Sequence, residues 1–285
     1  MSARPAERIC DRAYQALFCF APPQVREELG LRSFEHGPLF AGFAPRVDVP
    51  ALNRVLGLGR APDSFELLVR ALAWVRAGGA SQAVLPVLTS PTGARAGAWL
   101  LDQGLDLYGS RMRVSARLDL VSHPVSLHSV HAFRVGAIPA SELDSHTGLI
   151  SAVLGLPAAA AAWIASMREA TGWRHFGAYV NGRMAGAASM FVEGSACSLA
   201  FEAVPLDGRA HGMRGALLAA RLQAARASGC NEVGLEIPEG LNREGGEDGE
   251  AGEGIPLAEL AAWGFDRACR ETLYRYLRPG SGNST

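Results

Sequence analysis

The sequence predicts an α/β fold of two tandem domains, each a mixed, mostly antiparallel sheet flanked by helices. Two observations predict it. An apolar strand at residues 198–204, a glycine-bearing turn at 209–215 and an amphipathic helix at 216–227 follow one another, an order typical of sheets covered by helices. A similar order of helix, strand, helix and strand occurs earlier, at residues 67–118, which indicates an internal repeat.

The elements of the second half are predicted from periodicity and turn residues. Gly229 suits the end of the helix predicted at 216–227. The dipeptide Asn181-Gly182 predicts a tight hairpin within residues 176–191. A helical pair at 149–171 is interrupted by glycine and proline at 155–157. The remaining predictions are strands at 127–135, 232–237 and 272–277 and a short helix at 257–265.

Length and composition limit the function classes. The 285 residues suffice for two domains, and 48% of them are hydrophobic, so a core can form. The 27 basic residues are all arginine, which excludes lysine Schiff-base chemistry and suggests a GC-rich bacterial genome. A net charge of −1 without a basic stripe argues against a nucleic-acid partner.

Five scattered cysteines, without metal-ligand spacing, indicate reduced thiols. No signal peptide or bilayer-length apolar run is visible, so we expect a cytoplasmic protein with no membrane partner. His123, His128 and His131 lie close in sequence but match no zinc site, and we predict no metal. The glycine- and acid-rich run 243–254 is interpreted as a solvated insertion, with a lid over the active site as the alternative.

The turn from Arg209 to Gly215 has the chemistry of a pyrophosphate site. Its glycines let backbone approach a ligand closely, and a helix start offers unpaired N–H groups and a partial positive charge. Its spacing matches neither the dinucleotide fingerprint nor the P-loop. The alternative interpretation is an ordinary glycine-bearing loop before an amphipathic helix.

This turn resembles the Arg/Gln-x-x-Gly-x-Gly/Ala loop of GNAT N-acyltransferases, which binds the pyrophosphate of acyl-coenzyme A. Arg209 and Gly212 match the motif, whereas Arg214 stands at its last position and Gly215 comes one residue late. Together with the order of elements, the resemblance covers residues 128–279. It implies acetyl-CoA or another acyl-CoA as cofactor. It also implies that the pantetheine arm lies along the strand at 201–204, where a backbone N–H stabilises the oxyanion. The implied cofactor-binding residues are Ala203, Val204, Arg209, His211, Gly212, Met213, Arg214 and Gly215.

Direct attack by an amine needs a base to remove a proton from the ammonium. Glu202 is the first candidate, because it lies on the strand beside the expected thioester, and apolar neighbours would raise its pKa toward neutrality, as such a base requires. An outward-facing strand acid is the alternative, and Glu236 is the second candidate. Leu260 stands where the family often has a tyrosine that protonates the thiolate. Tyr274 on the last strand is a substitute, although a strand aromatic is commonly a core residue.

The earlier half lacks the glycine motif. The helix at 67–79 is preceded by Pro62, Asp63 and Ser64, an ordinary helix start, and Asp63 would repel a phosphate. We therefore predict a degenerate N-terminal GNAT-like domain over residues 1–122 and a C-terminal acyltransferase domain over 123–285. The predicted activity is acyl transfer, with acetyl as the first candidate group, to a small-molecule amine by a monomer or homodimer. The alternative is a catalytically weak coenzyme-A-binding module that serves regulation or assembly.

Overall fold

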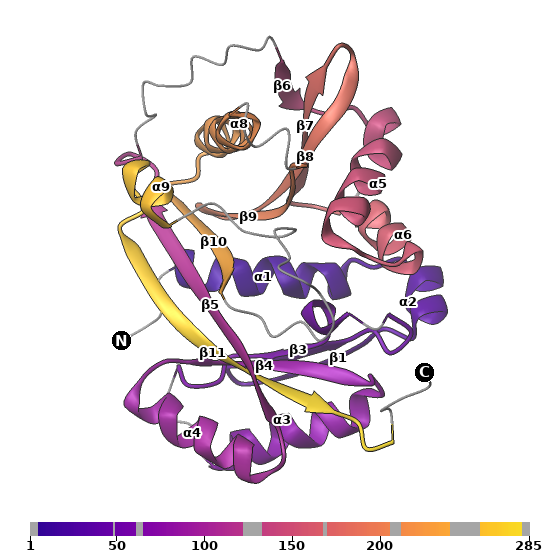
Figure 1. Cartoon of the computed structure of the whole chain (residues 1–285), viewed down its shortest axis with the longest axis vertical. Helices are drawn as coiled ribbons and strands as arrows, with labels where there is room; N and C mark the ends of the chain where they lie inside the picture. Colours follow the sequence, from indigo (N-terminus) through magenta and orange to yellow (C-terminus); the bar gives the residue numbers. More distant parts are fainter. Residues whose placement is uncertain are drawn as a thin grey trace. The chain divides into compact units, whose positions relative to one another are not determined.

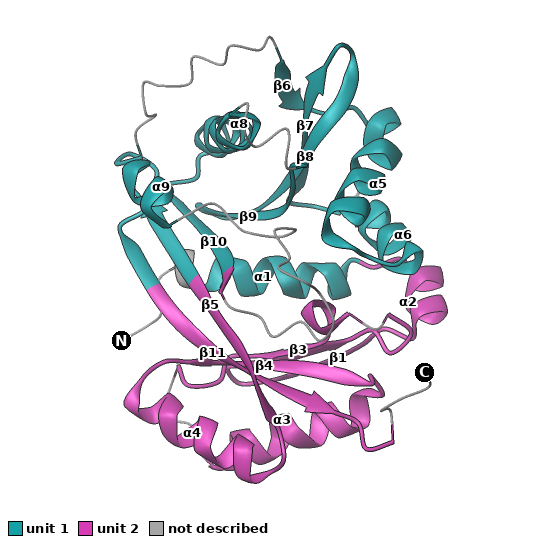
Figure 2. Ribbon diagram, in the orientation of Figure 1, with its two compact units in different colours: residues 1–20, 113–237, 246–268 teal, residues 21–112, 238–245, 269–285 magenta. Residues whose placement is uncertain are grey.

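The computed structural model describes residues 5–47, 49–60, 65–121, 133–167, 170–205, 212–239 and 257–280. The chain forms two compact units, neither of which is contiguous in sequence (Figure 2). Unit 1 contains residues 1–20, 113–237 and 246–268, and unit 2 contains residues 21–112, 238–245 and 269–285.

Unit 2 is a mixed sheet with helices (Figure 1). Its strand order is β1 (Arg32–His36), β2 (Leu39–Phe43), β3 (Arg54–Leu56), β4 (Gln82–Leu88), β11 (Arg267–Leu277) and β5 (Asp106–Arg117). β1, β2 and β3 pair antiparallel, β3 and β4 pair parallel, and β4 and β11 pair antiparallel. The helical elements are α2 (Pro23–Leu29), η1 (Pro50–Leu52), α3 (Phe65–Gly78) and α4 (Pro91–Asp102).

Unit 1 has the strand order β5, β10 (Glu232–Glu239), β9 (Ala196–Ala203), β8 (Arg183–Glu193), β7 (Trp173–Val180) and β6 (Arg134–Ala137). β10 and β9 pair parallel, and β9, β8, β7 and β6 pair antiparallel. β5 and β11 each contribute residues to both units. The helical elements are α1 (Pro5–Cys19), η2 (Ala140–Glu142), α5 (Leu143–Leu154), α6 (Ala158–Ser166), α8 (Met213–Ala227) and α9 (Leu257–Ala262).

Neighbouring residues of β8 contact helices on opposite faces of the unit 1 sheet. A Cβ on Gly186 would lie 2.6 Å from Met213 Sδ, so this glycine lets the start of α8 approach the sheet. The next residue, Ala187, belongs to a core cluster with Ile150 of α5 and Ile164 of α6. Because successive side chains of a strand point to opposite faces, α8 covers one face and α5 with α6 the other (Figure 1).

The first helix of the chain is part of unit 1. Phe18 of α1 is fully buried and meets the ring of Trp163 of α6 edge-on, with ring centroids 4.9 Å apart. The indole Nε1 of Trp163 donates a hydrogen bond to the Leu17 carbonyl oxygen at 2.9 Å. The end of α1 is therefore held by both apolar packing and a buried hydrogen bond.

The predicted α/β fold with a mixed sheet is confirmed. Asn181 and Gly182 have φ values of 50° and 77°, as the predicted hairpin turn requires. The helical pair is interrupted after Gly155, which has a φ of 63°. Of the strand predicted at 127–135, residues 134–135 belong to β6, and residues 127–132 lie outside the described residues. The compact units group the chain differently from a cut between residues 122 and 123, so that division into domains stays a prediction.

Candidate functional site

The described part of the predicted pyrophosphate loop is the start of α8. Gly212 is the N-cap in a left-handed conformation, with φ 74°, and no side chain of the described residues caps the helix start. A Cβ on Gly212 would meet nothing within 4 Å in the described part of the chain, so this backbone is open there to a ligand. Met213 and Gly215 are buried in the first turn. Arg209 and His211 lie outside the described residues.

β9 and β10 pair only over their first halves. Their parallel register runs from Ala196 opposite Glu232 to Leu199 opposite Leu235, although β9 continues to Ala203 and β10 to Glu239. Ala203 and the following Val204, both predicted to contact the cofactor, are buried at the end of β9, beyond its register with β10. The second halves of two adjacent strands are therefore not joined in a ladder, and an extended ligand chain can bind to a strand there.

A β-bulge at Phe201 changes the direction of the end of β9. Ala187 pairs with Ala203 and Ser189 with Ala200, so β9 has one residue more than β8 between these pairs. Phe201 has a φ of 48°, which is rare for an aromatic residue. Bulges of this kind increase local twist and occur beside active sites. The bulge contains no glycine, so the sequence analysis did not predict this bulge.

Glu202 joins β9 to α8 through two arginines. Its Oε1 lies 2.8 Å from Arg214 Nε, and its Oε2 accepts a hydrogen bond from Arg221 Nη2. Arg221 is fully buried and Glu202 is half-buried. We expected apolar neighbours around Glu202 and a phosphate beside Arg214. In the structure, Glu202 and Arg214 form an ion pair with each other. The guanidinium groups of Arg214 and Arg221 contact both carboxylate oxygens of Glu202.

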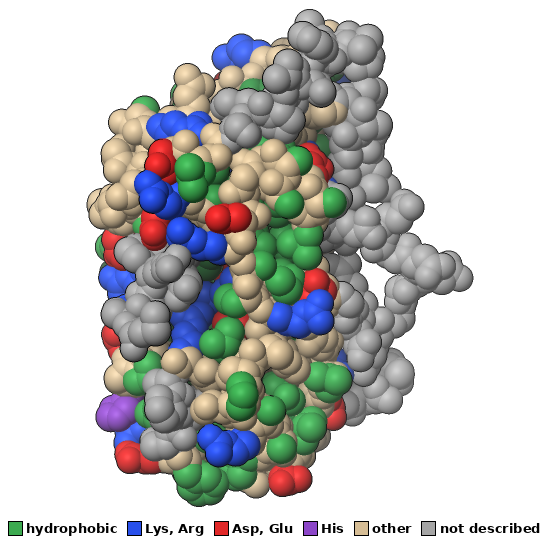
Figure 3. Space-filling view, turned by 90° about the vertical axis from the view of Figure 1, so that its left-hand side faces the viewer, with side chains coloured by type: hydrophobic (Ala, Val, Ile, Leu, Met, Phe, Trp, Pro, Cys, Tyr) green, Lys and Arg blue, Asp and Glu red, His purple; other side chains and the backbone are tan. Residues whose placement is uncertain are grey.

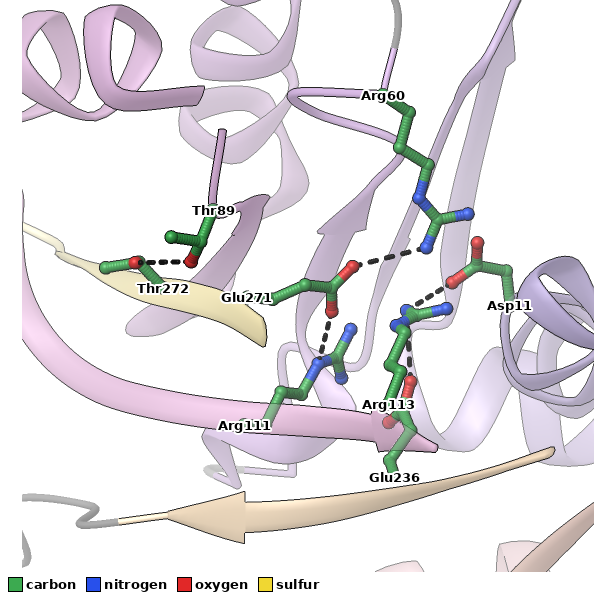
Figure 4. A network of polar contacts seen from close by, with 8 residues as sticks. All are labelled: Asp11, Arg60, Thr89, Arg111, Arg113, Glu236, Glu271 and Thr272. Carbon is green, nitrogen blue, oxygen red and sulfur yellow. Dashed lines mark hydrogen bonds and ion pairs between the residues drawn. The ribbon is translucent and has the colours of Figure 1, made fainter. Parts of the chain in front are cut away.

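Glu236 belongs to a second polar cluster of unit 1 (Figure 4). Arg113 Nη2 of β5 lies 3.0 Å from Glu236 Oε1 of β10 and 2.6 Å from Asp11 Oδ1 of α1. The side chains of Arg113, Asp11 and Glu236 are 6%, 11% and 22% exposed, so Glu236 is the most accessible of the three.

Tyr274 lies in the core of unit 2. It belongs to the apolar cluster with Leu85 and Leu100, and a Cβ on Gly97 of α4 would lie 1.9 Å from its hydroxyl oxygen. Burial raises the pKa of Tyr274. These surroundings agree with the core position that we weighed as the alternative to a role as general acid.

The glycine-bearing loop after β3 in unit 2 differs from the one before α8. A Cβ on Gly57 would lie 2.1 Å from the Pro38 carbonyl oxygen, and one on Gly59 would lie 3.0 Å from Leu88 N. This backbone is packed against neighbouring backbone, whereas Gly212 is open. The positions before α3 that suggested an ordinary helix start, residues 62–64, lie outside the described residues.

Beside this loop, Glu271 is fully buried with two arginine partners (Figure 4). Arg111 Nε donates to Glu271 Oε2 at 2.7 Å, and Arg60 Nη2 lies 3.2 Å from Glu271 Oε1. Thr89 and Thr272 share a hydrogen bond in the same unit. Burial of a carboxylate requires such partners, so this network fixes the part of β11 around Glu271 within unit 2.

The described residues contain little that favours a nucleophilic cysteine or a metal site. Cys197 is fully buried, and its pKa is raised by a hydrogen bond with Cys230 and by burial, so it suits a core position better than a nucleophile. No group of three His, Cys, Asp or Glu side chains in the described ranges is arranged to hold a metal ion. His123, His128 and His131 lie outside those ranges.

Figure 3 shows arginine, acidic and apolar side chains intermixed on the face that it draws. Among the residues that the structure describes, no helix combines the length and apolar character needed to traverse a bilayer.

The sequence analysis did not identify Arg221, Asp11 or Arg113. Arg221 falls between the apolar positions Leu218 and Leu222 of a helix. An arginine at such a position is expected to be buried beside an acidic partner, so the sequence contained a signal for this ion pair. Asp11 and Arg113 are 102 positions apart, and no local pattern predicts their contact.

The comparisons with known proteins agree with the fold. No family model matches the sequence, and no curated protein does. Among solved structures, a GCN5-related N-acetyltransferase from Kribbella flavida is 16% identical with a TM-score of 0.61, over 98% of this chain and 97% of the other. One from Sphaerobacter thermophilus is 14% identical with a TM-score of 0.57, over 98% and 93%.

A tandem GNAT protein from the clavulanic acid biosynthesis pathway is 15% identical with a TM-score of 0.53, over 97% of both chains. These similarities extend over nearly the whole length of each protein. At such low identity they show the fold, and the fold of this chain is that of tandem GNAT proteins.

Proposed function

We propose that the chain transfers an acyl group, in the simplest case acetyl, from coenzyme A to the amine of a small molecule by direct attack, with residues of unit 1. The observation that carries the proposal is the second half of β9, which pairs with β8 but lies beyond the register with β10, together with the open backbone of Gly212 at the start of α8. This is the arrangement that a diphosphate with an extended pantetheine arm needs.

The first turn of α8 fits a diphosphate. The N–H groups of Met213, Arg214 and Gly215 lie at a helix start without a side-chain cap, where the helix dipole favours an anion. Arg214 serves this site indirectly, because its ion pair with Glu202 fixes the helix start. Arg209 and His211 remain proposed phosphate contacts.

The end of β9 fits the pantetheine arm and the thioester. The bulge at Phe201 takes backbone groups out of the regular ladder just before Ala203 and Val204. A backbone N–H of Ala203 or Val204 would stabilise the oxyanion of the tetrahedral intermediate, a contribution of about 3 kcal/mol in acyl-transfer enzymes.

Glu236 is the stronger candidate for the base. Guanidinium groups engage both oxygens of Glu202, whereas Glu236 is the most exposed member of its cluster with Arg113 and Asp11. Glu236, directly or through a water molecule, accepts the proton of the ammonium, and the freed amine attacks the thioester carbonyl carbon. The Asp11 carboxylate adds negative charge that attracts the ammonium. A thiol has a pKa of about 8.5, so the thiolate of coenzyme A can leave without a side chain that protonates it.

The proposed partners are acyl-CoA and an amine acceptor, and neither nucleic acid nor membrane. The proposed location is the cytoplasm. The glycine-bearing loop after β3 in unit 2 is packed against neighbouring backbone at Gly57 and Gly59, so we propose that unit 2 does not bind the cofactor.

Acetyl-CoA binding and thiol release test the proposal. Calorimetry is expected to detect acetyl-CoA binding to the intact chain and a loss of binding in Gly212→Glu. Gly182→Glu, at an equally open hairpin turn, is the control and is expected to bind normally.

With a library of amines, thiol release is expected for the unchanged chain and is expected to fall by about a hundredfold in Glu236→Gln. Binding without release for any amine would support the coenzyme-A-binding module instead. Absence of acetyl-CoA binding would contradict both.

A further inference from the structure

Glu202 and Glu236, the two candidate bases, lie on opposite faces of the unit 1 sheet. Glu202 contacts two arginines of α8, so its side chain faces that helix. Glu236 is two positions beyond the register partner of Ser198, and side chains two apart on a strand share a face. The Ser198 hydroxyl donates to Cys10 Sγ of α1 at 3.5 Å, so Ser198 and Glu236 face α1. An amine that Glu236 deprotonates therefore approaches from the face opposite α8.

The end of β9 has apolar side chains around it on the face that α5 and α6 cover. Ala203, proposed for the oxyanion, is fully buried there in a cluster with Ile150 of α5, Ile164 of α6 and Ala187 of β8. Five further side chains pack against this cluster, and all five are partly exposed: Leu149 and Val153 of α5, Leu156 after it, Met184 of β8 and Phe201 of β9. We call these five residues the apolar patch.

The hydroxyl groups in the middle of α5 do not make the apolar patch polar. Ser151 falls between Leu149 and Val153, and its hydroxyl donates to the Thr147 carbonyl oxygen at 2.8 Å. The Thr147 hydroxyl donates to the Leu143 carbonyl oxygen at 2.9 Å. Both hydroxyls are therefore used within the helix. One exposed apolar side chain is ordinary, whereas several gathered in one place indicate a binding surface.

The apolar patch and the candidate base together limit the acceptor. In the proposed reaction the attacking nitrogen lies between Glu236 and the thioester at Ala203, so the rest of the acceptor lies on the face opposite α8. The apolar patch packs against the cluster that contains Ala203. Each methylene buried on such a surface strengthens binding by up to about fourfold. A charged or hydroxylated body would lose its water there without gaining partners.

We propose that the acceptor is a primary amine with a hydrocarbon body, alkyl or aryl, and that the apolar patch contacts this body. The inference rests on the proposed acyl transfer and narrows its acceptor. Amines with a second charge or several hydroxyls, such as polyamines and amino sugars, are then poor acceptors, because those groups would lie against apolar side chains.

Thiol release from acetyl-CoA with matched amines tests the proposal. The series is ethylamine, butylamine and hexylamine, with hexamethylenediamine as the counterpart of hexylamine that carries a second ammonium at its far end. We expect kcat/KM to rise about tenfold or more from ethylamine to hexylamine, and to fall about tenfold or more from hexylamine to hexamethylenediamine. Calorimetry of the amines with free coenzyme A, where no transfer can occur, is expected to give the same order of dissociation constants.

Two polar variants of similar shape assign the preference to the apolar patch. Met184→Gln and Val153→Thr are each expected to lower kcat/KM for hexylamine about threefold to tenfold and to leave that for ethylamine within about twofold. Val69→Thr, the same change at an exposed valine in a helix of unit 2, is the matched control and is expected to leave both values unchanged. Loss of folded protein would lower both rates alike, so it cannot imitate this effect.

The outcomes separate this inference from the function on which it rests. A kcat/KM for ethylamine or hexamethylenediamine that equals or exceeds that for hexylamine would overturn the inference and leave the acyl transfer standing. A chain-length preference that both variants retain would also overturn it, because the preference would then arise elsewhere. No thiol release with any alkyl or aryl amine would overturn the proposed function, and this inference with it.

Discussion

Glu202 Oε1 lies 2.8 Å from Arg214 Nε, and this contact joins the bulged end of β9 to the first turn of α8. Arg221, two turns further along α8 from Arg214, holds the other oxygen. Because the loop between the strand and the helix carries the predicted phosphate contacts, this pair of arginines fixes the orientation of both elements that flank the site.

Loss of Arg221 should destabilise unit 1. In Arg221→Met, the half-buried Glu202 carboxylate loses a fully buried partner, so we expect the free energy of unfolding to fall by about 3 kcal/mol in denaturant titrations. Arg117 pairs with Asp119 at the surface, where both side chains are more than half exposed. Arg117→Met should leave the unfolding midpoint unchanged, and an equal effect of the two variants would contradict the assigned role of Arg221.

Gly212→Ala and Gly182→Ala separate backbone strain from ligand contact. Both glycines have positive φ values, 74° and 77°, and open space where a Cβ would lie. Each substitution should therefore lower the free energy of unfolding by about 1 kcal/mol. Only Gly212→Ala should also raise the dissociation constant for acetyl-CoA, measured by calorimetry. A similar rise in both variants would show that strain, and not proximity to the ligand, is responsible.

Stability should decrease in mild acid because of His175. Its folded-state pKa is about 4, below the ordinary value of 6.5, so between these values the unfolded chain binds a proton that the folded chain does not. The free energy of unfolding should therefore fall as pH decreases from about 7 to about 4, by up to about 3 kcal/mol from this residue. Urea titrations at several pH values measure the slope.

The slope should be smaller in His175→Gln and unchanged in a variant of the exposed His36, His36→Gln. The same slope in all three proteins would assign the acid sensitivity to other groups.

Tyr274→Phe should retain turnover. The hydroxyl of Tyr274 lies in the apolar core of unit 2 against α4, so its removal changes packing and not proton transfer. Thiol release within about threefold of the unchanged chain, with a small shift of the melting temperature, is the expected result. A loss of about a hundredfold in turnover at unchanged stability would restore Tyr274 as the general acid.

Phe18→Ala should destabilise unit 1 although it lies near the start of the chain. The ring is fully buried against Trp163, so its truncation should cost about 3–5 kcal/mol in denaturant titrations. Truncation of the exposed Phe20 to alanine is the control and should have little effect. A fragment of residues 123–285 lacks α1 and should give the far-UV spectrum of a largely unfolded chain.

The sequence predicted the elements of the later half well because their signals are local. The dipeptide Asn181-Gly182, the break at Gly155 and the positive φ at Gly229 each determine a turn or a helix end without help from distant residues. The order of these elements was enough to predict the fold.

The first 50 residues and the surroundings of the candidate bases were not predictable in this way. α1 packs on β9, almost 180 residues later in the chain, and the bulge at Phe201 carries no glycine. The arginine partners of Glu202 and Glu236 come from other elements, so expectations built on sequence neighbours alone placed Glu202 among apolar groups.

The pairing of β4 with β11 has a consequence for synthesis. Residues 82–88 acquire their antiparallel neighbour only when residues 271–277 leave the ribosome. At roughly 5–20 residues per second, the nascent chain carries an uncapped hydrogen-bonding edge for about 10–40 s. Translation speed and chaperone supply should therefore influence the yield of native protein.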